Sequence, residues 1–345
     1  MSVAILSRNW AAPFNVIHLG QVGRVRGVTY ASVLPGGPSS LSFTLDIAPN
    51  ASSVALAPNR WLDIQACGRI VWSGVLEDAK RGSPWQITAS GIGMQAKKFM
   101  AFFRPTDIQG AIVANATNFG LPWNTPSPAM TACNSSKTYQ SLYEMLDNGP
   151  VWRVDPYGNP SNYTPPTTPN YLVNAARSPA RTIDGMATQA QVAYNGSDHS
   201  NAPWYKIVDD LANQARYGFR SVPLDLTGRG AITDAQATAE GTRFLKKVGG
   251  YGASYTEPVT VLQGQLMNLG GGLVDIRGVV AGEMVRIRGS EVNHDWDAAF
   301  STDFVIGECS CNADVGSLVM TPWSAQRRDI QSLLTAAAAS VVATS

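Results

Sequence analysis

The residues best suited to chemistry lie near the end of the chain, in the segment 291–303. Four carboxylates cluster here around His294: Glu291, Asp295, Asp297 and Asp303. Carboxylates at this density bind hard cations such as Ca²⁺, and a suitably spaced pair can carry out glycoside hydrolysis. The glycine and the twelfth-position glutamate of a calcium-binding loop are missing, however. We therefore favour the alternative interpretation, a solvated loop between two strands.

The other histidines and the cysteines show no arrangement typical of a catalytic or metal site. His18 and His199 are far from His294 and from each other, and none of the three belongs to an H-E-x-x-H pattern. The sequence contains no G-x-S-x-G elbow and no phosphate-binding loop. The cysteines follow neither a zinc spacing nor a disulfide framework, and we interpret them as reduced thiols: Cys67, Cys133, Cys309 and Cys311. We predict no enzymatic activity, no metal and no cofactor.

The chain carries little charge for its size. Of its 345 residues, 44% are hydrophobic and 15% are charged, whereas charged residues make up about a quarter of a typical globular protein. We interpret this as a surface that neighbouring subunits cover. The formal net charge of +1 argues against nucleic acid or an anionic membrane as the main partner. No apolar run approaches the roughly 18 residues of a membrane-spanning helix, and the N-terminus does not resemble a secretory signal.

Three strand-length runs in residues 60–98 organise the first part of the chain. Turn residues separate them, and they are Trp61 to Ala66, Ile70 to Leu76 and Trp85 to Ala89. In the first run Trp61 and Asp63 share one face and apolar residues share the other, which is typical of a half-buried strand. Leu41 to Ile47 alternates in the same way. We predict an antiparallel meander within residues 1–104 that closes into a small β-barrel or sandwich, and of these two we assign a β-barrel domain.

The middle region, residues 105–250, contains most of the chain's prolines. Between residues 120 and 203 they exclude long regular elements, so this insertion is either disordered or ordered by docking. Its many aromatic residues favour docking, because disordered segments are poor in them. We expect the insertion to decorate the molecule without belonging to a β core. Beyond it, apolar residues at helical spacing predict helices at about 204–216 and 233–248, the second starting with a capping box.

The last part of the chain resembles the first in its order of features. Short β-favouring runs and a polar hairpin predict a second small β-barrel over residues 251–324, followed by a helix and tail over 325–345. This similarity suggests an internal duplication. The predicted fold class is mainly β with minor α. It comprises two related small antiparallel β-barrel domains bridged by a helix-containing middle region with a long proline-rich insertion.

Several segments, taken in order, resemble a known family. They are GRIVWSGVLEDAKRGSPWQITASGIGMQAKK in the first β region, WYKIVDDLANQARYGFRSVPLD and FLKKVGG in the middle, and VVAGEMVRIRG with FVIGECSCNADVGSLVMTP near the end. In this order the chain resembles the hub of the tail tip, a minor tail protein of long-tailed bacteriophages, and is similar to baseplate hubs. The resemblance covers the chain except for the proline-rich insertion.

This resemblance implies a structural virion component. Hubs of this family place two related barrels per subunit in a ring of three, so a homotrimer presents six barrels to the six-fold tail tube, and a closed ring is an ordinary homo-oligomer. The implied role is to close the distal end of the tube and to link it to the distal tail protein ring, the tape-measure protein and receptor-binding proteins. The implied location is the tail tip of the virion, after synthesis in the host bacterial cytoplasm.

Two other functions stay open from the residues alone. A carbohydrate- or receptor-binding β module would use exposed aromatic side chains as stacking platforms, and a β-scaffold hydrolase would need two placed carboxylates, such as Glu291 with Asp303. In a hub, aromatic residues of the insertion would instead contact a neighbouring subunit, because aromatic anchors dominate interface energetics. The same candidates serve both roles: Trp123, Trp152, Tyr157 and Tyr163.

Overall fold

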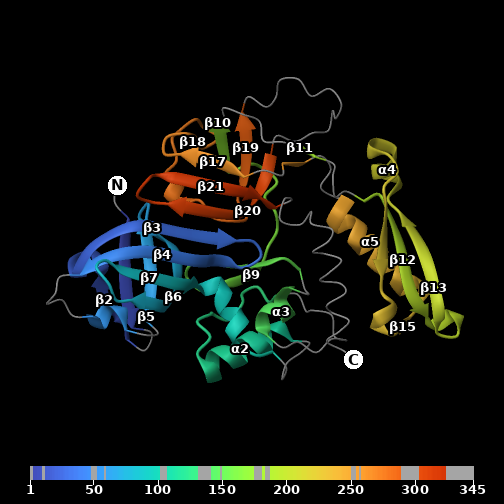
Figure 1. Cartoon of the computed structure of the whole chain (residues 1–345), viewed down its shortest axis with the longest axis horizontal. Coiled ribbons are helices and arrows are strands. Elements are labelled where there is room, and N and C mark those ends of the chain that lie inside the picture. The colour runs from blue at the N-terminus through green and yellow to red at the C-terminus, as the bar shows by residue number, and fades with distance from the viewer. Residues whose placement is uncertain are drawn as a thin grey trace. The chain divides into compact units, whose positions relative to one another are not determined.

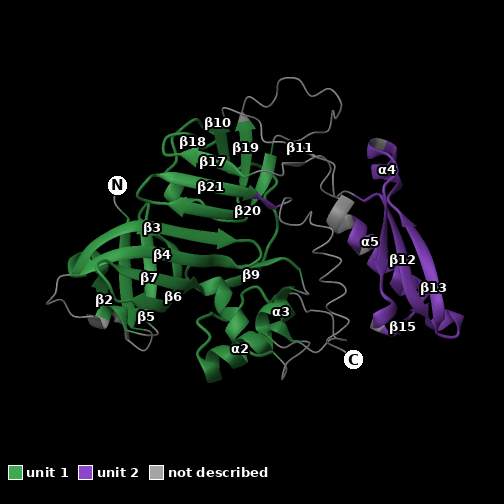
Figure 2. Cartoon of the chain, viewed as in Figure 1, with its two compact units in different colours: residues 1–178, 258–321 green, residues 179–257, 322–345 purple. Residues whose placement is uncertain are grey.

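Strands from both ends of the chain meet in one sheet in the computed structural model of this protein. The structure describes residues 3–9, 12–47, 53–57, 60–101, 107–130, 141–147, 150–174, 181–182, 187–249, 254–255, 258–288 and 303–323. The chain forms two compact units (Figure 2), Met1–Ser178 with Pro258–Thr321 and Pro179–Glu257 with Pro322–Ser345. None of the described helices is long and apolar enough to cross a membrane.

The first unit begins with an antiparallel run of strands that contains the predicted meander (Figure 1). These strands are β1 (Ala4–Asn9), β2 (Ala12–His18), β3 (Gly23–Val33), β4 (Gly37–Ile47), β5 (Arg60–Ala66), β6 (Arg69–Lys80) and β7 (Trp85–Gly91). They pair in the order β3-β4-β7-β6-β5-β1-β2. The three predicted runs lie in β5, β6 and β7, so the meander is confirmed.

Strand β5 differs from the prediction because both of its faces are buried except at Gln65, which is exposed. The alternation predicts a wet face for Trp61 and Asp63, yet both side chains lie in the interior. The Asp63 carboxylate accepts hydrogen bonds from the Trp61 indole over 2.8 Å and from the Ser73 hydroxyl over 2.6 Å, and it pairs with Arg8 over 2.7 Å. A buried charge is tolerated when it is paired and hydrogen-bonded. This network therefore allows the polar face of β5 to be covered.

The C-terminal strands continue the same sheet through β20 (Asp303–Asn312). The start of β20 pairs with β19, whereas Glu308–Asn312 pair with β3. The other elements of this region are β10 (Tyr171–Asn174), β17 (Val259–Leu262), β18 (Leu266–Met267), the 3₁₀ turn η5 (Ile276–Gly278), β19 (Met284–Arg288) and β21 (Ser317–Pro322). Within the described part of the chain the sheet has 13 strands.

The mainly β class is confirmed, whereas the predicted domain boundaries differ from the units. The regions 1–104 and 251–324 are joined because β20 is long enough to pair with strands of both. The middle region 105–250 is divided, since residues up to Ser178 belong to the first unit and the rest to the second. That the two β regions are related copies stays a prediction. The predicted helix and tail at 325–345 lie outside the described residues.

Short helices accompany the sheet in the first unit. They are α1 (Leu19–Val22), α2 (Ile108–Phe119) and α3 (Leu142–Asp147), with the 3₁₀ turns η1 (Ser53–Leu56) and η2 (Ile92–Lys98). The side chain of Asp107 caps α2 by accepting from the N–H of Gly110 over 2.9 Å. Helix α2 ends at Gly120, whose φ of 75° suits the left-handed C-cap position.

The described residues of the proline-rich insertion up to Asn174 belong to the first unit, and several of them lie in its core, which corrects the expectation that the insertion only decorates the molecule. From Gln189 onward the insertion contributes the eight-residue strand Gln189–Gly196 to the second unit. As its prolines predict, its regular elements before residue 175 are short: α3, β8 (Trp152–Val154), β9 (Pro160–Asn162) and β10. Strand β10 nevertheless pairs with β18 and β19. Short strands suffice here because the neighbouring strands supply the partners for their backbone groups.

The second unit contains a four-stranded sheet with helices. Its elements are β12 (Gln189–Gly196), η3 (Ser197–His199), β13 (Ala202–Asp209), α4 (Leu211–Tyr217), β14 (Ser221–Asp225), η4 (Thr227–Arg229), β15 (Ala231–Ile232) and α5 (Asp234–Gly249). Strand β12 is central, antiparallel to β13 and parallel to β14 and β15. A separate pair joins β11 (Arg181–Thr182) to β16 (Ser254–Tyr255).

The helix predicted at 204–216 is partly wrong. Residues up to Asp209 form β13, and the helix α4 begins only at Leu211. Pairing along the whole of β12 outweighs the local helical spacing in this segment. The second predicted helix is confirmed as α5. Its capping box is closed in both directions, because the N–H of Gln236 donates to the Thr233 hydroxyl over 3.2 Å and the N–H of Thr233 to the Gln236 side chain over 2.8 Å.

Candidate functional site

Trp123 and Trp152, the two expected interface anchors, lie together in the interior of the first unit. Their ring centroids are 5.7 Å apart, and Tyr143 packs edge-on against Trp152 at 5.4 Å. Trp152 is 1% exposed, and both rings belong to a core cluster with residues of η2, α2 and α3. Neither side chain offers surface to a partner or a sugar. The interface and stacking roles expected for these two residues therefore do not fit the structure.

Tyr163 and Tyr157 lie in different environments. Tyr163 is buried, and its hydroxyl donates to the backbone oxygen of Gly282 over 2.7 Å, while burial raises its pKa to about 12. It therefore ties the insertion to the C-terminal β region. Tyr157 is 57% exposed on a turn where the Asp155 side chain accepts from the Tyr157 N–H over 2.9 Å. Of the four candidates, Tyr157 alone presents its ring to solvent.

The acidic cluster does not form a described site. Glu291, His294, Asp295 and Asp297 lie outside the described residues. Asp303 makes a two-pronged ion pair with Arg286, with N–O distances of 2.7 and 2.9 Å, so this carboxylate has a structural partner. Within the described ranges no group of three or more His, Cys, Asp or Glu residues is placed to hold a metal ion.

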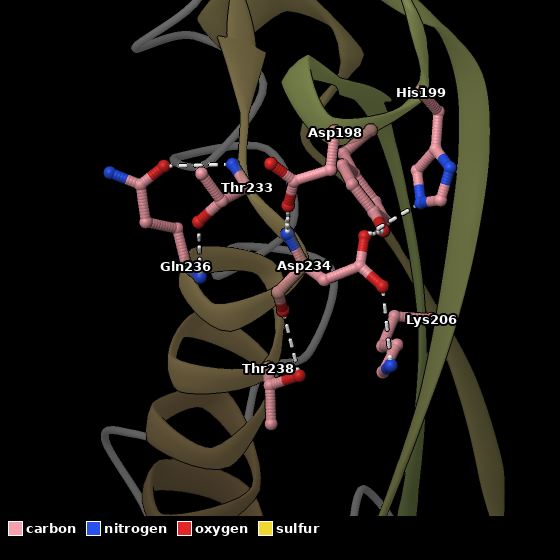
Figure 3. A network of polar contacts seen from close by, with 8 residues as sticks. Asp198, His199, Lys206, Thr233, Asp234, Gln236 and Thr238 are labelled. Carbon is pink, nitrogen blue, oxygen red and sulfur yellow. Dashed lines mark hydrogen bonds and ion pairs between the residues drawn. The ribbon is translucent and has the colours of Figure 1, made fainter.

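A polar network that the sequence did not indicate centres on Asp234, the first residue of α5 (Figure 3). One carboxylate oxygen, Oδ1, accepts from the Tyr194 hydroxyl over 2.5 Å and lies 2.9 Å from His199 Nε2. The other, Oδ2, lies 3.4 Å from Lys206 Nζ. The N–H of Asp234 donates to the Asp198 carboxylate over 3.0 Å. The partners come from β12, η3 and β13, so no spacing in the sequence could have revealed them.

The electrostatics of the network favour one charge state. The hydrogen bond from Tyr194, followed by those from His199 and Lys206, lowers the pKa of Asp234. Burial and the bond to Asp234 raise the pKa of Tyr194 to about 12. At neutral pH the centre is thus a carboxylate that a neutral phenol and a lysine contact. Because its partners come from three elements, the carboxylate fastens the β12–β13 hairpin to the start of α5.

Strand β13 carries two exposed aromatic residues of the second unit, Trp204 and Tyr205. Trp204 stacks on His199 with the ring centroids 4.3 Å apart, yet part of its ring is open to solvent. Tyr205 is 69% exposed and Ile207 is 49% exposed. Among the described strands β13 pairs only with β12. Within the described part of the chain one edge of β13 therefore has no strand paired to it, and the exposed residues of β13 are apolar except for Asp209.

A second exposed apolar surface lies on β17 and the β20–β21 hairpin of the first unit. It consists of Leu262, Val315 and Val319, all exposed. The N–H of Gln263 donates to the oxygen of Gly316 over 2.9 Å, which places the end of β17 beside the hairpin. The sequence from 258 to 274 contains no charged residue. This surface, the β17–β21 surface, suits contact with another protein better than contact with water.

The fold of this chain is similar to that of known phage tail proteins. The crystal structure of the 43 kDa tail protein of prophage MuSo2 from Shewanella oneidensis gives a TM-score of 0.57 at 11% identity, over 93% of this chain and 97% of that chain. A tail protein from Neisseria meningitidis MC58 gives 0.55 at 11% identity, over 93% and 97%. Prophage tail protein gp18 from Listeria monocytogenes EGD-e gives 0.55 at 9% identity, over 98% and 99%.

This chain has the fold of these phage tail proteins. The likeness extends over almost the full length of each, including both units. No protein-family profile matches the sequence, and no curated protein matches it either. At 9–11% identity the likeness concerns the fold, so residue roles have to be argued from this chain itself.

Proposed function

We propose that this chain is a structural subunit of a bacteriophage tail and that it forms the hub at the tail tip. The observation that carries the proposal is the fold likeness to three tail proteins over at least 93% of this chain. The order of segments in the sequence, which resembles tail-tip hubs, supports the position at the tip. The role is structural, without catalysis or a cofactor.

In this role three copies form a ring that closes the distal end of the tail tube. Each chain contributes two β regions, one built on β3–β7 and the other on β17–β21, so that three chains match a six-fold tube. The ring contacts the distal tail protein ring on one side and the tape-measure protein and receptor-binding proteins elsewhere. We assign subunit contacts to the β17–β21 surface, because exposed apolar patches on a folded protein commonly mark interfaces.

The test is the mass of the assembled chain together with its position in the particle. Native mass spectrometry and light scattering should give a multiple of three chains, and labelled chains should lie at the tail tip in electron micrographs of intact phage. Leu262→Lys should weaken the trimer, because it places a charge on the β17–β21 surface. The matched control is Val113→Lys, an exposed valine on α2. A ring of six chains, or a label along the tube, would contradict the proposal.

A carbohydrate-binding function has less support in this chain. Its expected platforms included Trp123 and Trp152, and both are buried. Tyr157 remains as an exposed ring, but single aromatic side chains on a surface are ordinary. A structural role therefore accounts for more of the molecule.

A further inference from the structure

Arg60, the first residue of β5, is a buried cation in the first unit. Its side chain is 6% exposed and shares one face of the strand with Leu62 and Ile64, which are fully buried. Among the described residues the buried charged side chains are those of Arg60 and Asp63. Asp63 pairs with Arg8 over 2.7 Å. Arg60 has no such partner within the described ranges, so its charge is the one that calls for an explanation.

Ser7 of β1 holds one edge of the Arg60 guanidinium. Nε donates to the Ser7 hydroxyl over 3.0 Å, and Nη2 donates to the Ser7 backbone oxygen over 3.1 Å. The Ser7 hydroxyl in turn donates to the oxygen of Ala55 in η1 over 2.6 Å. These acceptors are neutral, so they fix the position of the guanidinium and leave its charge uncompensated. The surrounding segment 47–62 contains no acidic residue that could compensate it.

The other edge of the guanidinium has no acceptor in the described chain. A guanidinium is a rigid planar fork of N–H donors. Nε and one hydrogen of Nη2 face Ser7, which leaves the edge formed by Nη1 and the second hydrogen of Nη2. Burial lowers the pKa of Arg60, yet an arginine side chain stays charged in a protein. A full positive charge is thus buried here, and buried charges are normally paired.

A carboxylate matches this edge in geometry and in charge. Its two oxygens accept parallel N–H bonds from one edge of a guanidinium. Its single negative charge neutralises Arg60, whereas a phosphate carries more than one charge at neutral pH and would leave an excess on an otherwise apolar face. We propose that Arg60 binds a carboxylate on its Nη1–Nη2 edge, beside β1 and η1. This inference rests on the buried charge and does not depend on the proposed function.

Two sources offer this chemistry. One is a small carboxylate from solution, and the other is an acidic side chain of a second copy of the chain. Both place the same group against Arg60, so the site itself does not distinguish them. A small carboxylate would change the stability of the chain and leave its mass unaltered. An acidic side chain of a second copy would make the assembly depend on Arg60.

The first test measures the thermal midpoint of the full-length chain in sodium acetate, sodium phosphate and sodium chloride at equal ionic strength. For a dissociation constant of about 10 mM, about 0.1 M acetate should raise the midpoint by about 3–6 °C relative to chloride. Phosphate should raise it less. Arg60→Met keeps the length of the side chain without its charge and should abolish the acetate shift. Arg60→Lys keeps the charge without the fork and should lose at least about half of the shift.

The matched control is Arg26→Met. Arg26 is an exposed arginine of β3 that already pairs with Asp46 over 3.3 Å, so its removal should leave the acetate shift intact. Circular dichroism of each variant checks that it is folded. If Arg60→Met does not fold, Arg60→Lys still tests the proposal, because it retains the buried charge.

The second test identifies the source by measuring the mass of the chain against concentration by sedimentation. If a second copy supplies the carboxylate, Arg60→Met should raise the dissociation constant of the assembly by at least about tenfold, and Arg26→Met should not. An unchanged mass together with an acetate shift would assign the carboxylate to solution. An acetate shift that Arg60→Met retains, or a larger shift in phosphate than in acetate, would overturn the proposal. The absence of both an acetate shift and an effect on mass would overturn it as well.

Discussion

The indole N–H of Trp123 donates a hydrogen bond to the backbone oxygen of Ile92 over 2.9 Å, inside the core of the first unit. This bond joins the proline-rich insertion to η2, the turn that follows the last strand of the meander. Trp123 therefore acts as a core residue. The insertion and the N-terminal β region should accordingly unfold together.

Trp123→Ala should destabilise the first unit by about 3–5 kcal/mol, because it removes a buried aromatic ring and leaves a cavity. The matched control is Tyr157→Ala, which truncates an exposed ring on the same insertion and should change the free energy of unfolding by no more than about 0.5 kcal/mol. Urea unfolding followed by circular dichroism measures both. If Trp123→Ala kept full stability and only weakened assembly, the earlier expectation of an interface anchor would be right after all.

The Asp234 network should make the second unit sensitive to acid. Since the bond from Tyr194 and its other contacts lower the pKa of Asp234, the ionised carboxylate favours the folded state. This stabilisation is present above the ordinary aspartate pKa of about 3.9 and is lost as the pH falls through the lowered pKa of the folded chain. Asp234→Asn should therefore lower the thermal midpoint at about pH 6, and its deficit against the unmodified chain should shrink toward about pH 3.

The control for this titration is Asp78→Asn. The Asp78 carboxylate lies 3.9 Å from the Lys80 amine, and both side chains are exposed. The ion pair therefore contributes little to the stability of the folded chain. Its thermal midpoint should stay close to that of the unmodified chain at both pH values. A deficit for Asp234→Asn that stays constant with pH would show that the shape of the side chain matters there and its charge does not.

Local patterns predicted the parts of the fold that local forces determine. The alternation in residues 41–47 and 61–66 is that of strands, and the capping box at Thr233 marks the start of α5. In the segment 204–211, however, apolar residues fit both a helical and an alternating spacing. The choice there depends on β12, a partner that lies elsewhere in the sequence. Pairing with a distant strand decided the structure of this segment.

The candidate site was harder to predict for the same reason. The sequence around Trp123 and Trp152 does not distinguish a core residue from an interface residue. Both roles call for an aromatic residue in a loop. The burial of the two rings depends on η2 and α3, which no spacing connects to them. The Asp234 carboxylate likewise collects its partners from three elements. The folded arrangement brings these groups together, and no motif encodes it.

The docking of the insertion onto the sheet can be tested at Gly37, the first residue of β4. Beside it, the N–H of Gly36 donates to the oxygen of Trp152 over 3.2 Å, and the N–H of Val154 donates to the oxygen of Gly36 over 2.9 Å. A Cβ added to Gly37 would lie 2.1 Å from the backbone oxygen of Val154. Gly37→Ala must therefore push β8 away from β4, which would open the core around Trp152.

The matched control is Gly27→Ala. Both glycines have positive φ angles, 106° at Gly37 and 65° at Gly27, but a Cβ at Gly27 would meet no atom within 4 Å. Gly27→Ala should cost only the backbone strain of about 1 kcal/mol, whereas Gly37→Ala should cost about 3 kcal/mol because the clash adds to the strain. Urea unfolding followed by tryptophan fluorescence measures both, since Trp152 is buried at the affected contact. Equal costs for the two variants would mean that β8 can leave β4 without penalty and that the insertion is not part of the core.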